Sequence, residues 1–194
     1  MSRVAPYDPA TLDAEQRALY DELCSGPRAN PSRPGGPVDP AGRLTGPFNA
    51  MLHSPRVGGP LQRLGAALRY ESRLEGAVRE MVILLVAGHH DCAVERVAHQ
   101  RIARELGVDE ETLATLDRAQ VPASFGADAD PTAAPALELA QRILTRRLPG
   151  ELIDDAEFAA LRDALGDQGI FEVSTLVGYY ATLATQLALF GVEP

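Results

Sequence analysis

The sequence predicts an all-α fold, a compact subunit of about seven to eight helices. Beyond Pro47, apolar residues recur at the spacing of helix turns in almost every segment, whereas no stretch shows the alternation of apolar and polar residues that a half-buried strand requires. Residues typical of helix ends also stand between the segments: Gly107 suits a helix C-terminus, and Asp109 suits the start of the next helix. Both observations favour helices throughout.

The first expected helix covers residues 12–24, where Leu12, Leu19 and Leu23 form an apolar stripe among acidic residues. Residues 25–47 are rich in proline and glycine and are therefore expected to form a long loop rather than regular structure. A loop of this length serves either as a cover over a functional site or as a plain connector, and the sequence leaves both interpretations open.

The remaining helices follow from the same periodicity. They are expected at about residues 48–53, 56–71, 75–89, 91–106, 109–118, 132–147, 154–165 and 168–190. The helix that begins at Glu75 contains seven consecutive apolar residues, Met81 to Ala87, which cover every side of two turns. We therefore expect it to be the central helix, enclosed by the others. A second linker, rich in Pro, Gly, Ala and Asp, runs from Val121 to Pro135.

A single domain is expected to span residues 1–194, because a chain of 194 residues suits one hydrophobic core. In this assignment residues 44–118 form the core of the domain, residues 25–47 its loop and residues 132–190 its C-terminal helices. Hydrophobic residues make up 45% of the chain and charged residues 23%, which is the balance of a soluble globular protein.

Charge and composition exclude several classes of function. The net charge of −9 disfavours binding to nucleic acids, because the chain as a whole repels phosphate backbones. All 18 basic residues are arginine, so no lysine is present to form a Schiff base, hold pyridoxal phosphate or grip phosphate in a P-loop. The motifs of dinucleotide-binding folds, serine hydrolases, zincins and dithiol enzymes are also missing. We therefore expect no cofactor.

The cysteine content and the absence of a signal-like N-terminal stretch predict a cytoplasmic protein. The chain has only Cys24 and Cys92, too few for a disulfide framework. The most apolar stretches, Met81–Ala87 and Val173–Phe190, are too short or too rich in Thr, Tyr and Gln to span a bilayer. No membrane partner is expected.

One acidic residue stands out in the central helix. Glu80 directly precedes the apolar run and shares a helix face with Ile83, Leu84 and Ala87. It is either a surface acid, paired with a nearby arginine such as Arg79, or a buried carboxylate. A carboxylate buried without a partner has a raised pKa, which suits an acid catalyst near neutral pH.

The next helix, expected to start with Asp91 as its N-cap, carries a polar stripe. Cys92, Glu95 and His99 lie on one face, which continues through two residues expected to belong to the core, Ile102 and Leu106. The polar side chains are therefore expected to point inward. Glu95 and His99 are also close enough for a hydrogen bond, which would fix the imidazole tautomer and favour its protonated form.

Three separated blocks resemble the carboxymuconolactone decarboxylase family, which includes the alkylhydroperoxidase D-like proteins. The blocks are G-P-F-N-A-M-L-H-S-P at 46–55, R-E-M-V-I-L-L-V-A at 79–87 and C-A-V-E-R-V-A-H-Q-R-I-A-R-E-L-G-V at 92–108. The segment L-V-G-Y-Y at 176–180 is similar to the longer decarboxylase-like members. The resemblance implies an all-helical subunit that forms trimers or hexamers, with a cofactor-free site between helices.

The resemblance also implies roles for individual residues. In the peroxidase branch a proton relay uses a glutamate, a C-x-x-C motif and a histidine. Glu80, Cys92 and His99 match three of these positions, but Glu95 replaces the second cysteine, so a resolving thiol is missing there. The decarboxylase-like branch has E-W-x-x-H in the same place, which Glu95 and His99 fit, while Arg96 replaces the tryptophan.

These residues lead to the expected function, a cofactor-independent lyase or isomerase acting on a small anionic cyclic acid or lactone. His99, held by Glu95, would supply or remove a proton, and Glu80 would share that proton or stabilise the developing enolate. The side chains expected to contact the substrate are Cys92, Asn49, Arg96, Arg43 and Tyr179.

Two other functions remain open at this stage. One is an alkylhydroperoxidase-like antioxidant protein with Cys92 as the reactive thiol. The other is a non-catalytic oligomer that binds a ligand in the same helical pocket. His89 and His90 lie near Glu95 in the sequence, but their spacing defines no closed set of metal ligands, so we expect no metal site.

Overall fold

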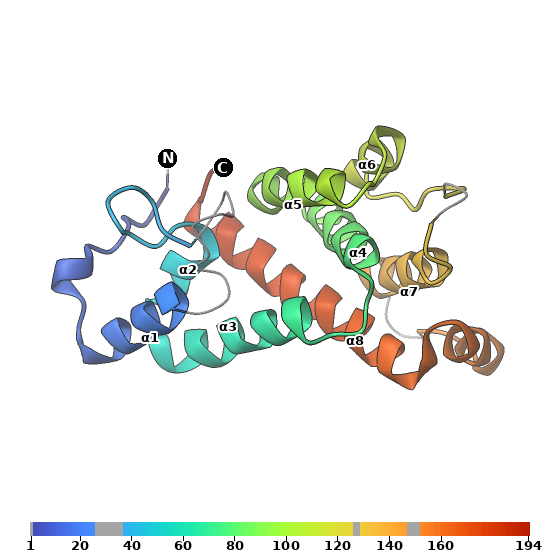
Figure 1. Cartoon of the computed structure of the whole chain (residues 1–194), viewed down its shortest axis with the longest axis horizontal. Coiled ribbons are helices and arrows are strands. Elements are labelled where there is room, and N and C mark those ends of the chain that lie inside the picture. Colours follow the sequence, from blue (N-terminus) through green and yellow to red (C-terminus); the bar gives the residue numbers. More distant parts are fainter. Residues whose placement is uncertain (1, 26–36, 126–128, 147–151) are drawn as a thin grey trace. The chain divides into compact units, whose positions relative to one another are not determined.

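The computed structural model describes residues 2–25, 37–125, 129–146 and 152–194. Within these residues the regular elements are helical, and the only β-type pairing is an isolated bridge between Val38 and Leu44. The prediction of an all-α fold is thus confirmed (Figure 1). Residues 26–36 of the predicted loop, 126–128 of the second linker and the last position of the helix expected at 132–147 lie outside the described residues.

The chain divides into two compact units. Unit 1 comprises Met1–Glu71 and Thr185–Pro194, and unit 2 comprises Ser72–Ala184. The assignment of one domain to residues 1–194 stays a prediction.

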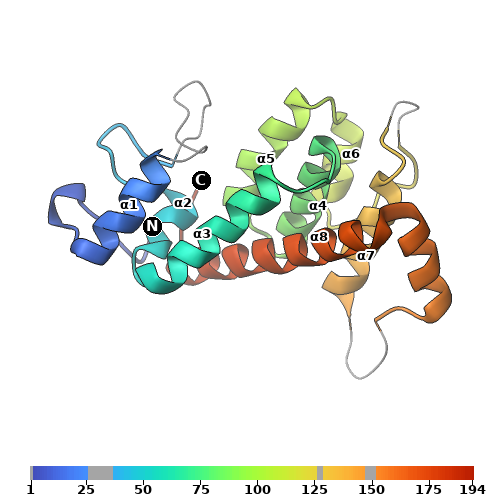
Figure 2. The same cartoon turned by 60° about the horizontal axis from the view of Figure 1, so that its bottom comes forward.

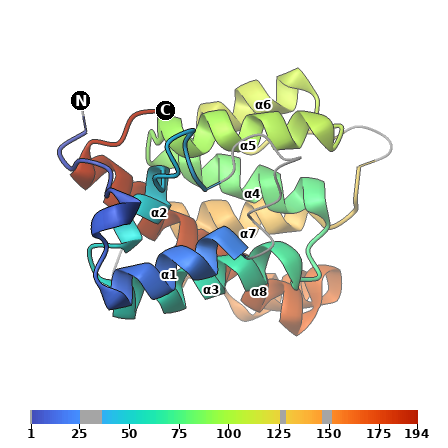
Figure 3. The same cartoon turned by 60° about the vertical axis from the view of Figure 1, so that its left-hand side comes forward.

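Unit 1 consists of the short 3-10 helix η1 (Pro9–Thr11), the helices α1 (Ala14–Ser25), α2 (Gly46–Met51) and α3 (Pro55–Tyr70), and the C-terminal end of the chain. The helix α3 packs against both α1 and α2, and its course beside α1 can be followed in Figure 3. Leu19 and Leu23 of the predicted stripe are buried in this unit. Asn49 anchors the N-terminal segment, because its side-chain oxygen accepts a hydrogen bond of 3.0 Å from the backbone N–H of Tyr7.

Unit 2 is built around α4 (Gly76–His89), which packs against α5 (Ala93–Glu105), α6 (Glu110–Asp117) and α7 (Ala133–Thr145). Figure 2 shows α4 running beside α5 and α6. Its first turn is capped by the carboxylate of Glu75, which accepts hydrogen bonds from two backbone N–H groups. All seven residues from Met81 to Ala87 are buried, so the predicted central helix is confirmed.

The helix α8 (Asp155–Phe190) contains a bend at Gly166, whose φ of 66° and ψ of 167° are not helical. A residue with a side chain rarely adopts this φ, so glycine permits the change of direction. The bend separates the two helices predicted at 154–165 and 168–190, as the sequence indicated.

Among the described residues, α8 is the helix long and apolar enough to meet a length-and-hydropathy test for a membrane span, with a mean hydropathy of 1.2 in its best window. Within the structure, 44% of that window is buried. The buried positions include Val173, Val177, Tyr180 and Leu187, at the spacing of one helix face. This one-sided burial is typical of a core helix.

Candidate active site

The packing of α4 against α5 brings together three ionisable side chains, Glu80, Glu95 and His99, which we call the acid/base cluster. Glu80 lies in the buried part of α4, and the other two lie one turn apart on the inner face of α5. The start of α5 differs from the prediction. Cys92, rather than Asp91, is its N-cap, because Asp91 has a φ of 48° and forms the turn out of α4.

The imidazole of His99 lies between the two carboxylates. Its Nδ1 is 2.5 Å from Oε2 of Glu80, and its Nε2 is 3.1 Å from Oε2 of Glu95. All three residues are inside the unit, with exposed fractions of 0% for Glu80 and 5% for each of the others. Since an ionised carboxylate only accepts hydrogen bonds, this geometry holds an imidazolium that donates from both nitrogens.

The surroundings set the charge of His99 in two opposing ways. Burial disfavours the charged imidazolium, but the hydrogen bonds to Glu80 and Glu95, together with the charges of these carboxylates, outweigh burial and raise the pKa of His99 above its ordinary 6.5. The two carboxylates thus favour the protonated form of His99, which can act as an acid.

The histidines of unit 2 provide a direct check of this charge state. Burial and the neighbouring His89 lower the pKa of His90 below 6.5. In an NMR titration of the imidazole resonances, we therefore expect His99 to lose its proton at a higher pH than His90. Because the pKa of His99 is raised by folding, its contribution to stability is complete below pH 6.5 and is lost as the pH rises through the folded-state pKa. Equal midpoints for His99 and His90 would contradict the assignment.

An aromatic side chain of α8 also borders the cluster. The ring of Tyr180 stands edge-on to that of His99, with centroids 5.2 Å apart and planes at 89°. Tyr179, the residue chosen from the sequence, packs on Tyr180 instead, with centroids again 5.2 Å apart. The helical spacing of the sequence could have indicated Tyr180, because it lies on the same face of α8 as the buried Val173 and Val177.

Cys92 is buried at the start of α5, with an exposed fraction of 7%. Burial raises the pKa of its thiol above the ordinary 9.0, although hydrogen bonds from the backbone N–H groups of Glu95 and Val94 oppose the shift. The stripe on α5 ends sooner than predicted. Ile102 is only partly buried, and Leu106, the C-cap of α5, is 44% exposed.

The arginines and the asparagine expected to bind substrate have partners of their own. Arg96 forms ion pairs with Asp91 and Asp117, at 2.5 and 3.0 Å. Arg43 lies in unit 1, where Asp39 binds it at 2.7 Å. Asn49 also lies in unit 1 and holds the N-terminal segment. Within unit 2, the ion pairs of Arg96 are with Asp91 and Asp117 rather than with the acid/base cluster.

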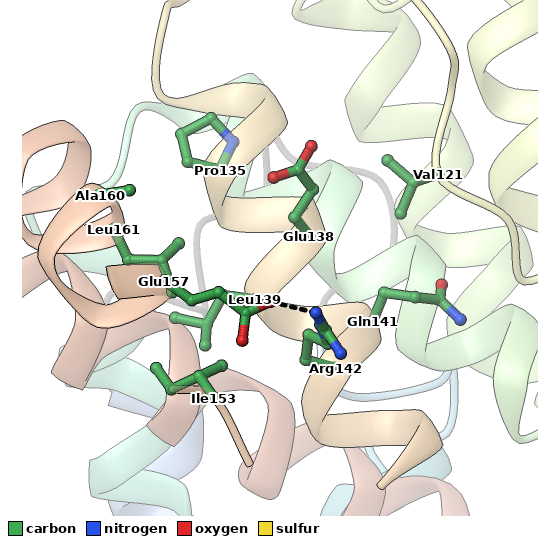
Figure 4. A pocket seen from close by; sticks show the side chains of 10 residues that line it. All are labelled: Val121, Pro135, Glu138, Leu139, Gln141, Arg142, Ile153, Glu157, Ala160 and Leu161. Carbon is green, nitrogen blue, oxygen red and sulfur yellow. Dashed lines mark hydrogen bonds and ion pairs between the residues drawn. The ribbon is translucent and has the colours of Figure 1, made fainter. Parts of the chain in front are cut away.

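A cavity of about 510 Å³ in unit 2 is lined by residues outside the cluster. Its walls come from α7, the first part of α8 and the second linker, and Figure 4 shows Arg142 facing Glu157 across it. A smaller cavity of about 190 Å³ lies in unit 1 beside Phe190. Neither cavity is lined by a residue of the cluster. Within the described residues, no group of His, Cys, Asp and Glu side chains has the arrangement of a metal site.

Comparison with known proteins agrees with the resemblance found in the sequence. Residues 55–139, which include the whole acid/base cluster, match the model of the carboxymuconolactone decarboxylase family. The structure is similar to the crystal structure of an alkylhydroperoxidase AhpD core, an uncharacterized peroxidase-related protein from Ralstonia eutropha JMP134. The TM-score is 0.69 and the identity 20%, over 100% of this chain and 92% of that chain. This likeness establishes the fold alone. No curated protein matches the chain.

Proposed function

Since residues 55–139 carry the carboxymuconolactone decarboxylase family match on an alkylhydroperoxidase-like fold, we propose that the protein is an acid/base enzyme that decarboxylates or isomerises a small cyclic acid or lactone. The observation that carries this proposal is the buried imidazole held between two carboxylates. Such an arrangement stores one proton among three groups and can release it to a reacting carbon.

The proposed chemistry needs only proton transfer. In a decarboxylation, the bond between the ring and the carboxylate breaks, carbon dioxide leaves, and the electron pair stays on the substrate as an enolate conjugated with the lactone carbonyl. His99 then protonates one carbon of that enolate and regains a proton from water. In an isomerisation, the cluster removes a proton from one carbon and returns it to another.

The chain's residues distribute these tasks. His99 is the proton donor, because both carboxylates favour its charged form. Glu95 holds Nε2 and Glu80 holds Nδ1, so the ring is fixed in one orientation. No step calls for a lysine or for any of the cofactor-binding motifs that the sequence lacks.

The proposal also covers the location and partners of the protein. It includes a cytoplasmic location, a small anionic substrate and a homo-oligomer, a trimer or hexamer, with neither nucleic acid nor membrane as partner.

The experiment that tests the proposal is solvent exchange. In deuterium oxide, the wild-type protein is expected to catalyse deuterium incorporation into a carboxylated muconolactone or its decarboxylated product, detected by NMR. Glu95→Gln keeps an acceptor for His99 but removes its charge, so we expect exchange to slow by about 10²-fold. Glu105→Gln is the matched control, because Glu105 is an exposed glutamate on the same helix that pairs with Arg101 at the surface. Equal exchange in all three proteins would refute the acid/base role.

The similarity to a peroxidase-related protein raises the alternative that Cys92 is a reactive thiol. The raised pKa and burial of this thiol, together with a glutamate in place of the neighbouring cysteine, favour the acid/base proposal. At pH 7 we expect a thiol-specific alkylating reagent to modify the partly exposed Cys24 before Cys92. We also expect Cys92→Ser to retain solvent exchange. Consumption of peroxide with oxidation of Cys92 in each turnover would support the thiol mechanism instead.

A further inference from the structure

An anionic substrate needs a cation near the acid/base cluster. The cluster combines two carboxylates with one imidazole, so when all three groups are charged its net charge is negative and repels a further carboxylate. The arginines expected from the sequence to supply the cation are already bound to other acids, Arg96 to Asp91 and Asp117, and Arg43 to Asp39.

Arg79 is better placed than Arg96 or Arg43 to supply the cation that a substrate carboxylate needs. It directly precedes Glu80 in α4, and its Nε lies 3.8 Å from Oε1 of Glu80. This distance allows an ion pair but is too long for a hydrogen bond. The Nε atom is buried and donates no hydrogen bond to any described residue. A buried donor without an acceptor is costly, so an arriving carboxylate oxygen would satisfy it.

The position of Arg79 also suits recognition at the edge of the cluster. Its side chain is 16% exposed, whereas that of Glu80 is completely buried, so Arg79 reaches closer to solvent than the acid beside it. A guanidinium offers planar pairs of N–H donors that match a carboxylate. A substrate carboxylate bound there would place its ring near Glu80 and His99.

We propose that Arg79 binds the carboxylate of the substrate and so determines that the enzyme accepts acids rather than neutral lactones. This inference rests on the proposed function, because it names the group that recognises the substrate of the same site. It replaces Arg96 and Arg43 as the expected binding residues, since the contacts of those two residues leave them engaged elsewhere.

The experiment uses a muconolactone acid as probe and its methyl ester as the neutral match. In wild-type protein labelled with ¹⁵N, the acid is expected to shift the NMR resonances of the Arg79 Nε–H group and of the His99 imidazole. These shifts should reach a plateau as the concentration of the acid rises. The ester should bind about 10- to 100-fold more weakly, since the charge-assisted hydrogen bond is lost. Arg79→Gln should remove the preference for the acid over the ester. Arg79→Lys keeps the positive charge but loses the paired N–H donors of the guanidinium, so it should retain part of that preference.

Two further variants and the activity assay separate the outcomes. Arg101→Gln, on the exposed side of α5, is the control for loss of a positive charge and should retain the preference for the acid. Loss of preference in Arg96→Gln instead of Arg79→Gln would overturn the proposal, as would an Arg79 resonance that the acid leaves unmoved in the wild type. If Arg79 responds but no lactone exchanges deuterium, the proposed function fails while the anion site stands. If both Arg79→Gln and Arg79→Lys catalyse exchange with the KM of the wild-type protein, Arg79 does not bind the substrate, while the proposed acid/base function stands.

Discussion

Replacing His99 with alanine is expected to lower the rate of deuterium exchange into the lactone substrate by about 10³-fold, the contribution of a positioned general acid. The expectation follows from the geometry, because this imidazole contacts both carboxylates of the cluster. Glu80 and Glu95 remain in the variant, but neither is then held by a shared cation. The rate is measured by NMR in deuterium oxide at a pH below the folded-state pKa of His99.

The same substitution also affects folding, and the design must separate the two effects. Removing the imidazole takes away the cation that lies between two buried carboxylates, and breaking a buried ion pair costs roughly 3–5 kcal/mol of unfolding free energy. Urea denaturation of His99→Ala therefore accompanies the rate measurement, and His99→Gln serves as a second variant that keeps a polar side chain. His90→Ala is the matched control, because His90 is exposed at the end of α4. A folded His99→Gln protein with the wild-type exchange rate would exclude the acid/base role.

Replacing Gly88 with alanine is expected to destabilise unit 2 by about 3 kcal/mol, near the upper end of overpacking costs. A Cβ atom at this position would lie 2.3 Å from the carbonyl oxygen of Leu116 and 3.1 Å from the backbone nitrogen of Ala119. Both are backbone atoms, one in the last turn of α6 and one just after it, and they cannot rotate away as a side chain can. The two helices must therefore separate, and the packing between α4 and α6 is lost.

Gly178 provides the control for this prediction. It also lies in a helix, but a Cβ atom there would meet nothing within 4 Å. Gly178→Ala is thus expected to leave stability unchanged or to raise it by about 0.5–1 kcal/mol, because alanine favours the helix more than glycine does. Urea denaturation followed by circular dichroism measures both variants. Equal stability of Gly88→Ala and the wild-type protein would show that α4 and α6 are not in the close contact described.

The helices could be predicted because their signal is local. The apolar run Met81–Ala87 identifies an enclosed helix without knowledge of its neighbours, and the expected break near residue 166 depends only on the flanking residues. The predicted helix boundaries were wrong where a neighbouring element determines the backbone conformation. Asp91 has the residue type of an N-cap, but the turn out of α4 gives it a positive φ and moves the cap to Cys92.

The candidate site could be predicted in part for the same reason. Glu95 and His99 share a face because they lie one helical turn apart, so their contact at 3.1 Å follows from the geometry of a helix. The apolar run drew attention to Glu80 and the resemblance implied its role, but only packing between α4 and α5 places its carboxylate on the other ring nitrogen. The ion pair between Arg96 and Asp117 could not be predicted from the sequence either, because Asp117 belongs to another helix, α6.

The amino-acid order by itself determined the helical class, the central helix and the pairing of Glu95 with His99, since all three depend on residues within a few turns of one another. Tertiary structure alone decided which groups surround His99: Glu80 on Nδ1, Tyr180 at its edge, and Arg79 beside Glu80. Contacts between helices depend on the angle and depth at which they pack, and these are set by the combined side chains of many residues rather than by any short stretch of sequence.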